Sequence, residues 1–474
     1  MRNTFHLKTL AVAIATLSVA SVTNAAGLDR SGQDVTAFFQ DGTYAEAVYT
    51  YIDADVSGYD SANVNPGQND YERGNKTGDI AESYDFFRYG VKTDINDTFS
   101  IGLLYDEPFG AAAEYTQSNF VSQGDVDASI ASITNGAAPS LAAAQGAIGA
   151  LAAGETAGVL TPEQQAQLDG LRGAVAVAQA EAGNAGENTN VEVRSQSLTG
   201  ILGMKFGANK NFQIYGGPVA QRIQSETKLR GLAYGPATGY TSNSNPDMDY
   251  GYIAGIAYSK PEIALKAALT YRSEIDHDIE ISESYPLVAI RAIAAGATPE
   301  QAAAAANRDS TYEITTPKSV NFDFQTGINP TTLATAKVRW VPWSDFVITP
   351  PLYNDTSKIS YGPDGLNLVE YDDDQWQVEL GLAKRVAPAL AISGTVGWDS
   401  GAGDPTTSLG PVDGYYSVGL GAKYNVTENW AVSAGGKYLW FGDAKGRLPS
   451  GKIVGDFQDN DGYIAGLKIS YQGK

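Results

Sequence analysis

Apolar and polar residues alternate one by one through most of the chain, and the pattern is sharpest towards its end. In 413–425, Tyr416, Val418 and Leu420 share one face of an extended chain, while small or polar residues occupy the other. Alternation at period two predicts β-strands with one apolar face. In 413–425, 429–441 and 462–471 that face begins and ends on Trp or Tyr. Aromatic residues at both ends are typical of strands that cross a membrane.

The same alternation predicts fourteen strands. A soluble β-sandwich would alternate too, but it has no reason to place aromatic residues at both strand ends. An even count suits a single-chain bacterial barrel, so we predict an all-β fold, a 14-stranded antiparallel transmembrane β-barrel. The predicted strands are 43–57, 83–93, 98–115, 191–207, 211–227, 249–259, 262–281, 312–328, 332–353, 369–386, 389–400, 413–425, 429–441 and 462–471.

The connections between these strands alternate in length. Those after even-numbered strands are short, at 94–97, 208–211, 260–261, 329–331, 387–388 and 425–428. Those after odd-numbered strands are long, at 58–82, 116–190, 228–248, 282–311, 354–368, 401–412 and 442–461. Outer-membrane barrels have short periplasmic turns and long extracellular loops. We therefore predict a barrel domain over 43–474 in the bacterial outer membrane.

Two long loops, 116–190 and 282–311, contain helix signals. The sequence Thr-Pro-Glu-Gln occurs at 161–164 and at 298–301. Threonine can cap a helix, proline suits its first position, and glutamate favours its first turn. We predict short extracellular helices after both, and another at 141–154 that its glycines weaken. The alternative for 125–190 is low-complexity disorder.

The first residues predict export. Residues 1–25 combine two basic residues, an apolar run from Leu10 to Val22 and small residues before Ala26, as in a secretory signal peptide. The net charge is −22, and loss of two basic residues leaves 30 − 54 = −24. So acidic a chain is a poor candidate for nucleic acid. It contains no cysteine, so disulfides do not stabilise it.

The third predicted strand contains a break. It begins regularly at Ser100, but Pro108 and Gly110 follow before the pattern ends at Tyr115. Proline cannot donate a ladder hydrogen bond, and glycine weakens a strand interior. Hydrocarbon does not tolerate unpaired backbone unless protein or a cavity covers it. We therefore predict an inward kink at Pro108, Phe109 and Gly110 rather than a strand end.

Several segments resemble the FadL-type family of outer-membrane transporters for long-chain fatty acids and other hydrophobic compounds. Five segments carry the resemblance: 47–56, 95–115, 268–280 with "ALTYRSE", 316–324, and 338–346 with "WSDF". The resemblance implies a 14-stranded barrel, an N-terminal hatch in the lumen, a substrate groove on the loops and a lateral opening at a third-strand kink. The predicted hatch, 26–42, is shorter than the family's and lacks its Asn-Pro-Ala motif.

The resemblance also implies binding residues. Arg222 falls where the family has a basic residue implicated in holding the ligand's carboxylate, and Lys228 and Arg230 follow in the next loop. The alternative for Arg222 is a lumen charge paired with Glu226. The family's second basic position lands near 349–351, where no cation occurs. From the residues alone, candidates for an apolar groove are Phe109, Phe120, Leu232, Tyr234, Tyr240, Leu287, Val288, Ile290 and Ile293.

An enzyme is not favoured, and no cofactor or metal site is predicted. His277 is the only histidine outside the signal peptide, and its neighbours Asp276 and Asp278 would point to the opposite strand face. The leading hypothesis is passive uptake of long-chain fatty acids or related hydrophobic molecules, by a monomer that releases them sideways into outer-membrane lipid. The alternatives are a channel for neutral hydrocarbons or aromatics, and an open porin for hydrophilic solutes.

Overall fold

Fourteen antiparallel strands close into a barrel, in which β1 pairs with both β4 and β25. The computed structural model describes residues 28–473, so the predicted signal peptide lies outside the described residues. The predicted strand count is confirmed. The wall strands are β1 (Tyr44–Asp55), β4 (Tyr84–Asp94), β5 (Phe99–Asp106) with β6 (Gly110–Tyr115), β7 (Thr189–Phe206), β8 (Phe212–Lys228), β9 (Thr241–Ser244) with β10 (Asp247–Lys260), β11 (Leu265–Arg272) with β12 (Ile275–Ser284), β13 (Asn307–Thr316) with β14 (Ser319–Asn329), β15 (Thr332–Val341), β18 (Gln375–Ala387), β19 (Leu390–Asp399), β21 (Tyr415–Asn425), β22 (Trp430–Phe441) and β25 (Asp461–Gln472).

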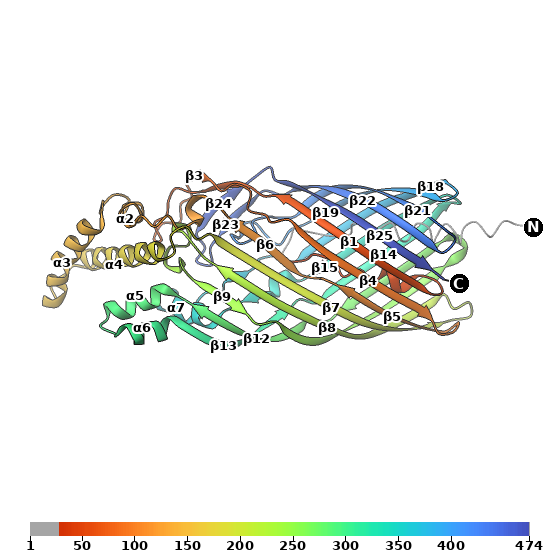
Figure 1. Cartoon of the computed structure of the whole chain (residues 1–474), viewed down its shortest axis with the longest axis horizontal. Helices are drawn as coiled ribbons and strands as arrows, with labels where there is room; N and C mark the ends of the chain where they lie inside the picture. The colour runs from red at the N-terminus through yellow and green to blue at the C-terminus, as the bar shows by residue number, and fades with distance from the viewer. Residues whose placement is uncertain (1–27, 474) are drawn as a thin grey trace, which may run out of the picture.

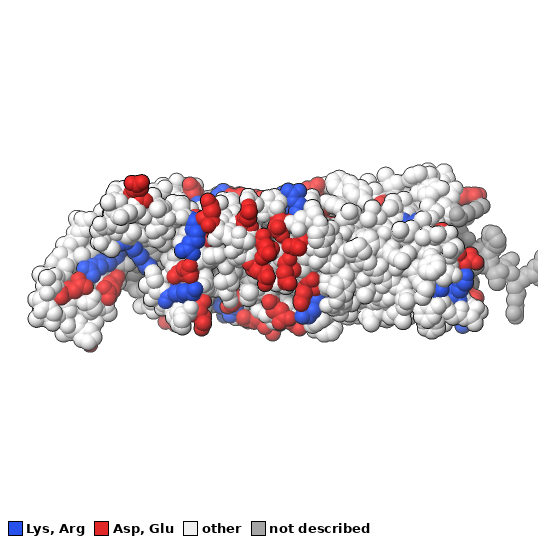
Figure 2. All heavy atoms as spheres, turned by 90° about the horizontal axis from the view of Figure 1, so that it is seen from below, with Lys and Arg blue, Asp and Glu red and all other residues white. Residues whose placement is uncertain are grey.

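Side chains on the wall strands point alternately into and out of the barrel. In β21, Tyr416, Val418 and Leu420 are exposed on the outside, whereas Tyr415 and Ser417 are buried. In the view of Figure 2, a broad band towards the short-turn end carries very few charged side chains, and acidic and basic residues gather nearer the helical end. An apolar outer band is what contact with lipid requires. Among residues 28–473, no helix is both long and apolar enough to cross a membrane.

The two ends of the barrel differ, as loop parity predicts (Figure 1). Both Thr-Pro-Glu-Gln sequences form capping boxes that begin helices, and the 125–190 region is helical. The long connections hold α2 (Val126–Ile133), α3 (Leu141–Ala157), α4 (Pro162–Gly183), α5 (Pro286–Ala294), α6 (Pro299–Ala306), α7 (Pro351–Tyr361), the short helices η2 (Ser118–Phe120), η3 (Leu232–Ala237) and η5 (Trp343–Asp345), a sheet of β2 (Gly58–Ser61), β3 (Arg73–Lys76), β20 (Thr406–Thr407), β23 (Ala444–Arg447) and β24 (Ile453–Phe457), and the pair β16 (Val347–Ile348) and β17 (Val369–Glu370).

The ninth wall strand is shorter than predicted. It ends at Val341, not near 353, because Pro342 follows without an N–H to donate and the chain enters η5 and then α7. Trp343 of η5 is fully buried, with its ring against those of Phe346 and Tyr371. An aromatic core thus fills the long-loop half of the lumen.

The N-terminal segment lies inside the barrel. It includes η1 (Thr36–Phe39), and Phe38 is 1% exposed among inward-facing wall residues such as Tyr215, whose ring centroid lies 5.9 Å from its own. We call residues 28–41 the hatch. Its burial fills the middle of the lumen, between the aromatic core and the short-turn end.

Candidate functional site

The break in the third strand leaves a gap in the wall between β4 and the junction of β5 with β6. Tyr89 pairs with Tyr105 below the gap, and eight residues further along each strand Ala81 bridges Ala113. Between these pairs, β4 residues 84–88 have ladder partners on β1 alone, within the described chain. The register is therefore the same on both sides of the gap, but the hydrogen-bonded ladder is interrupted.

On its other side the third strand carries a bulge. Asp106 pairs with Ser197 and Gly110 pairs with Arg194, so four steps along the third strand match three along β7. One extra residue on one strand is a β-bulge, which bends that strand and redirects its side chains. Phe109, which lies in the bulge, is 1% exposed and belongs to the aromatic core. The residues of the predicted kink, Pro108, Phe109 and Gly110, thus lie at this bulge, with Phe109 buried in the barrel interior.

The hatch covers the bulge from inside. The N–H of Gly110 donates to the carbonyl of Leu28, and the N–H of Arg30 donates to the carbonyl of Pro108, both at 2.8 Å. The Nε of Arg30 also donates to the carbonyl of Gly110, at 2.6 Å. Buried backbone groups need such partners. The hatch therefore supplies hydrogen bonds that the interrupted wall does not.

Four side chains occupy the gap: Arg30, Tyr84, Glu107 and Arg194. The hydroxyl of Tyr84 donates to Glu107 Oε2 at 3.2 Å, and the guanidinium of Arg30 lies 3.9 Å from the centre of the Tyr84 ring. Burial lowers the pKa of Arg30 to about 10, so it is still a cation at neutral pH. Its Nη1 is buried and makes no hydrogen bond. A desolvated donor is thus held beside the gap.

Three small cavities lie between the loops and this gap. The outer groove, about 80 Å³, is lined by Val64, Pro66, Tyr234, Tyr285, Leu287, Arg291, Tyr353, Tyr361 and Lys452, among others. The inner cavity, about 50 Å³, is lined by Leu28, Ala111, Val191, Val193, Tyr312, Ile348, Leu368, Tyr371 and Leu409 with small and hydroxyl residues. The gate cavity, about 90 Å³, includes Arg30, Ile80, Gly110, Ala111, Leu409 and Phe441.

The cavities differ in charge. No charged side chain lines the inner cavity, which shares Ala111 and Leu409 with the gate cavity. The outer groove has two cations, Arg291 on α5 and Lys452 on the β23–β24 connection. Lys452 Nζ donates to the carbonyl of Asn65 at 2.6 Å, and burial lowers its pKa to about 8. Sequence reasoning missed Lys452, because a lone lysine after a turn carries no pattern.

The three predicted carboxylate-binding cations do not come together. Arg222 is exposed on the outer face of β8, opposite Met248 of β10, so it does not line the lumen. The sequence itself indicates that the Arg222 side chain points outward, because alternate residues of a strand share one face and the even-numbered Phe212 of the same strand is exposed on the outside. Lys228 pairs with Glu226, and both are about two-fifths exposed. Buried Arg230 donates four hydrogen bonds to Glu187, Thr241 and two backbone carbonyls, which leaves it a structural role.

The predicted apolar residues do not form one groove. Tyr234 and Leu287 line the outer groove. Phe120 and Tyr240 are fully buried beneath it, where Tyr240 donates to Glu283 at 2.9 Å. Val288 and Ile290 pack on the same core, Leu232 packs on the helices of the 116–190 loop, and Ile293 is 53% exposed.

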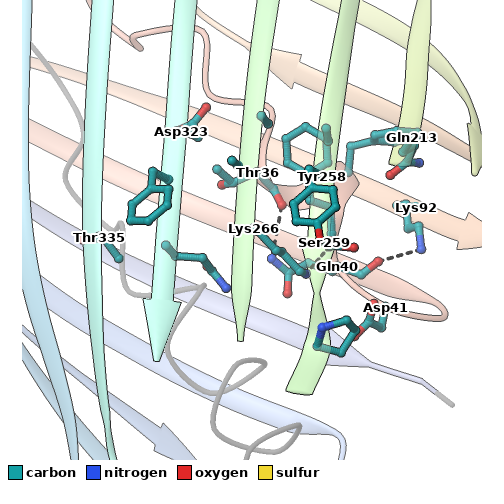
Figure 3. Close-up of a pocket in the computed structure, with 18 of the residues that line it drawn as sticks. Thr36, Gln40, Asp41, Lys92, Gln213, Tyr258, Ser259, Lys266, Asp323 and Thr335 are labelled. Carbon is teal, nitrogen blue, oxygen red and sulfur yellow. Dashed lines mark hydrogen bonds between the residues drawn. The ribbon is translucent and has the colours of Figure 1, made fainter. Parts of the chain in front are cut away.

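A much larger cavity, about 770 Å³, lies at the short-turn end (Figure 3). Its lining is rich in charge, and Lys92 points to the hatch, donating to the carbonyl of Gln40 at 2.6 Å. Further up, Lys337 binds Asp34 at 2.9 Å, and buried Arg339 holds both carboxylate oxygens of Asp29 at 2.6 and 3.1 Å. A polar vestibule suits solvent more than an apolar ligand, so we place the candidate site in the upper lumen.

Comparisons with known proteins agree with this architecture. The model of a family described as outer membrane protein transport protein (OMPP1/FadL/TodX) matches residues 35–472. No curated protein sequence matches the chain significantly. The fold is similar to a crystal structure of a Pseudomonas aeruginosa FadL homologue, with TM-score 0.59 and 15% identity over 95% of this chain and 98% of that one.

A second solved structure, of the P. putida toluene transporter TodX, has TM-score 0.51 and 12% identity over 92% of each chain. A deltaS2 mutant described as a TodX monoaromatic hydrocarbon channel has TM-score 0.53 and 10% identity over 97% of this chain and 100% of that one. At these identities the structures show a shared fold. Because the family model spans nearly all the described residues, the chain belongs to the OMPP1/FadL/TodX family of outer-membrane transport proteins.

Proposed function

We propose that the protein takes up small, neutral hydrophobic molecules and releases them sideways through the third-strand gap. The inner cavity carries this proposal, because no charged side chain lines it. Apolar surroundings with few polar groups favour an uncharged apolar ligand, and an unpaired carboxylate there would be costly. A structural relative, described as a toluene transporter, supports the same ligand class.

The ligand would move from the outer groove to the inner cavity and then to the gate cavity. Each cavity is smaller than the ~150 Å³ that holds benzene in an engineered protein interior, at about 80, 50 and 90 Å³ here. Side chains must therefore part for a ligand to pass. Departure of residues 28–31 from the bulge would then open the gap to the membrane. A lumen filled by the hatch and an aromatic core speaks against an open porin.

A cavity-filling variant tests the route. Val193 is 4% exposed and lines the inner cavity, so Val193→Trp should block it and reduce toluene uptake into proteoliposomes by about tenfold or more. Val418→Trp is the matched control, because Val418 faces lipid and is 45% exposed. Heat-modifiable migration on gels checks that both barrels fold. Equal uptake by the two variants would remove the inner cavity from the route.

Long-chain fatty acids are the second candidate. The observation that favours them is the free, buried Nη1 of Arg30 in the gate cavity, together with Arg291 and Lys452 in the outer groove. Cations in partly desolvated places bind carboxylates well. Competition between oleate and an uncharged alkane of the same length separates the two ligand classes. Preference for the alkane supports the first candidate, and preference for oleate supports the second.

A further inference from the structure

The wall has a second interruption, between β10 and β12. Ile253 pairs with Arg272 below it, and nine residues further along each strand Ser244 pairs with Ile281 above it. Between these pairs, residues 247–251 and 275–279 exchange no backbone hydrogen bond within the described chain. We call this interruption the seam.

The seam has a geometric cause. On β10 the odd-numbered residues face inward, and on β9 the even-numbered residues do. The neighbouring strand also changes the parity of its inward residues, from even-numbered on β11 to odd-numbered on β12. This change occurs around Ser273, closer to the short-turn end of the barrel. Residues opposite each other between these two points therefore face opposite sides of the wall. A regular ladder cannot form there, so side chains must hold the strands together.

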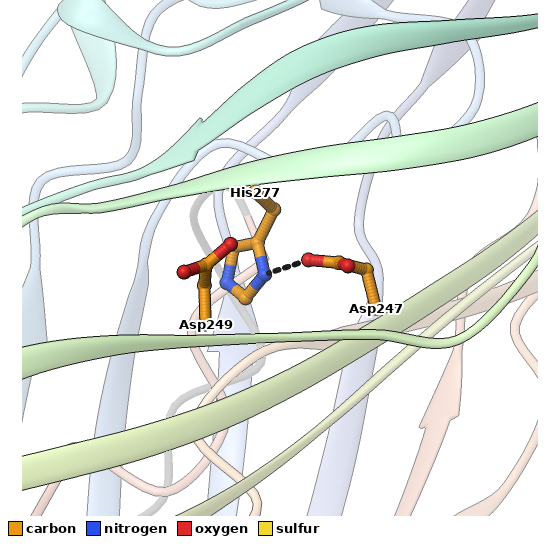
Figure 4. A group of neighbouring side chains, drawn as sticks. All are labelled: Asp247, Asp249 and His277. Carbon is orange, nitrogen blue, oxygen red and sulfur yellow. Dashed lines mark hydrogen bonds and ion pairs between the residues drawn. The ribbon is translucent and has the colours of Figure 1, made fainter.

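One side-chain cluster crosses the seam (Figure 4). It consists of Asp247 and Asp249 on β10 and His277 on β12, and one ligand atom from each lies within 4.8 Å of the others. His277 is 0% exposed, with Nδ1 3.1 Å from Asp247 Oδ2 and Nε2 3.1 Å from Gln221 Oε1. Figure 4 shows the ring lying between the two carboxylates.

The hydrogen-bond pattern of this cluster requires a positive charge beside Nδ1 of His277. Gln221 Oε1 also accepts from the hydroxyl of Thr316 at 2.7 Å, so it is the acceptor for an N–H at Nε2 of His277. A neutral imidazole then presents its lone pair at Nδ1 to a carboxylate oxygen of Asp247. Two acceptors at that distance repel unless a positive charge lies between them, which a second ring proton or a bound metal cation would supply. Within residues 28–473, no lysine or arginine forms an ion pair with Asp247 or Asp249.

We propose that Asp247, Asp249 and His277 bind a divalent transition-metal cation of the Zn²⁺ type, which clasps β10 to β12. One imidazole and two carboxylates form a common ligand set for such ions, and water would complete the coordination. The three donor atoms lie within 4.8 Å of one another, so the two aspartates would rotate to bring them to one centre. Gln221 acts as the outer partner that orients the imidazole through Nε2. The proposal does not depend on which hydrophobic molecule the barrel transports.

The chain offers a clean binding assay. His277 is the only histidine after residue 6, so protein that carries no polyhistidine tag has a single imidazole once the signal peptide is removed. Protein stripped with EDTA and titrated with ZnCl₂ in a calorimeter should bind about one equivalent of zinc.

Three variants identify the ligands. His277→Gln and Asp249→Asn should each weaken zinc binding by about tenfold or more. Asp276→Asn is the matched control, because Asp276 neighbours His277 but points outward and accepts from Thr315. Absence of zinc binding by the stripped wild-type protein would overturn the proposal. That result is expected if Nδ1 of His277 carries a proton that it donates to Asp247. Unchanged binding by both ligand variants, or equal loss in Asp276→Asn, would also overturn it.

Discussion

The gap beside β4 and the seam beside β12 lie on opposite sides of the hairpin formed by β7 and β8, and each accompanies a one-residue bulge in the strand next to that hairpin. Four steps along the third strand match three along β7, and four steps along β9 and β10 match three along β8. In each case the bulged strand pairs with the hairpin on one side and loses its ladder on the other. Each interruption lies just above an outward-facing tyrosine of the wall, Tyr105 at the gap and Tyr271 at the seam.

The two interruptions differ in what closes them. Residues 28–31, part of a separate segment inside the lumen, cover the first. Three side chains of the wall strands themselves span the second. A separate segment can leave without disturbing wall pairing, whereas the cluster can separate only if the wall opens. The same backbone irregularity thus suits a gate in one place and a fixed joint in the other.

The largest expected effect comes from locking the gate. The chain contains no cysteine, so Ala81→Cys with Ala113→Cys gives a single disulfide across the top of the gap, where the two residues already form a bridge. We expect toluene uptake into proteoliposomes to fall by about tenfold in the oxidised protein, because the gap can no longer widen. Reductant should restore uptake.

The matched lock is placed at the seam. Asn243 and Ser282 are paired and exposed just above it, so Asn243→Cys with Ser282→Cys gives the equivalent disulfide there. We expect uptake to stay within about twofold of wild type, because the proposed exit is the gap and not the seam. A large loss with this lock, or none with the first, would reverse the roles assigned to the two interruptions.

The next effect comes from straightening the kink with Pro108→Val and Gly110→Val. A Cβ at Gly110 would lie 3.0 Å from the carbonyl oxygen of Val193 and 3.3 Å from Arg30 Nε, so the hatch contact must give way. We expect the third strand to pair with β4 and toluene uptake to fall by about fivefold. The control is Pro218→Val with Gly200→Val, at outward positions where the nearest atom to a Gly200 Cβ is 3.8 Å away. Equal uptake by both doubles would mean that the bulge plays no part in release.

A smaller effect is expected from loosening the hatch. Arg339 and Asp29 form a buried ion pair, with side chains 5% and 0% exposed, and breaking such a pair costs about 3–5 kcal/mol. Arg339→Gln should therefore accelerate hydrogen exchange in residues 28–41, measured by mass spectrometry. Arg308→Gln, which removes an exposed pair with Asp355, should leave exchange there unchanged. Hatch exchange that is equally slow in both variants would show that this ion pair does not anchor it.

The smallest effect concerns pH. The pKa of Lys452 is lowered by burial to about 8, so the side chain is a cation below that pH and loses its charge above it. Octanoate is ionised throughout, so its binding should weaken by about two- to threefold between pH 7 and pH 9, as one of two groove cations is lost. Toluene binding should not change over this range. Calorimetric titration at both pH values measures the difference, and an identical response of the two ligands would exclude Lys452 from carboxylate recognition.

Local chemistry accounts for what the sequence could predict. Period-two alternation located the wall strands, loop parity separated the two ends, and the Thr-Pro-Glu-Gln sequences located two capped helices. The site was harder, because it depends on contacts between segments far apart in the chain. Nothing in residues 28–31 shows that they pair with the kink. Nor does the neighbourhood of His277 in the sequence reveal that its partners are Asp247 and Asp249.

The two bulges have a consequence for the barrel as a whole. A closed barrel has a shear number, the total stagger after one circuit of its strands, and this number together with the strand count sets its tilt and diameter. The first bulge shifts the register between the third strand and β7 by one residue. The second bulge shifts the register between β8 and the β9–β10 strand by one residue in the opposite sense. The shear number is therefore equal above and below the two interruptions. The third strand can meet β4 or leave it without any change in the diameter of the barrel.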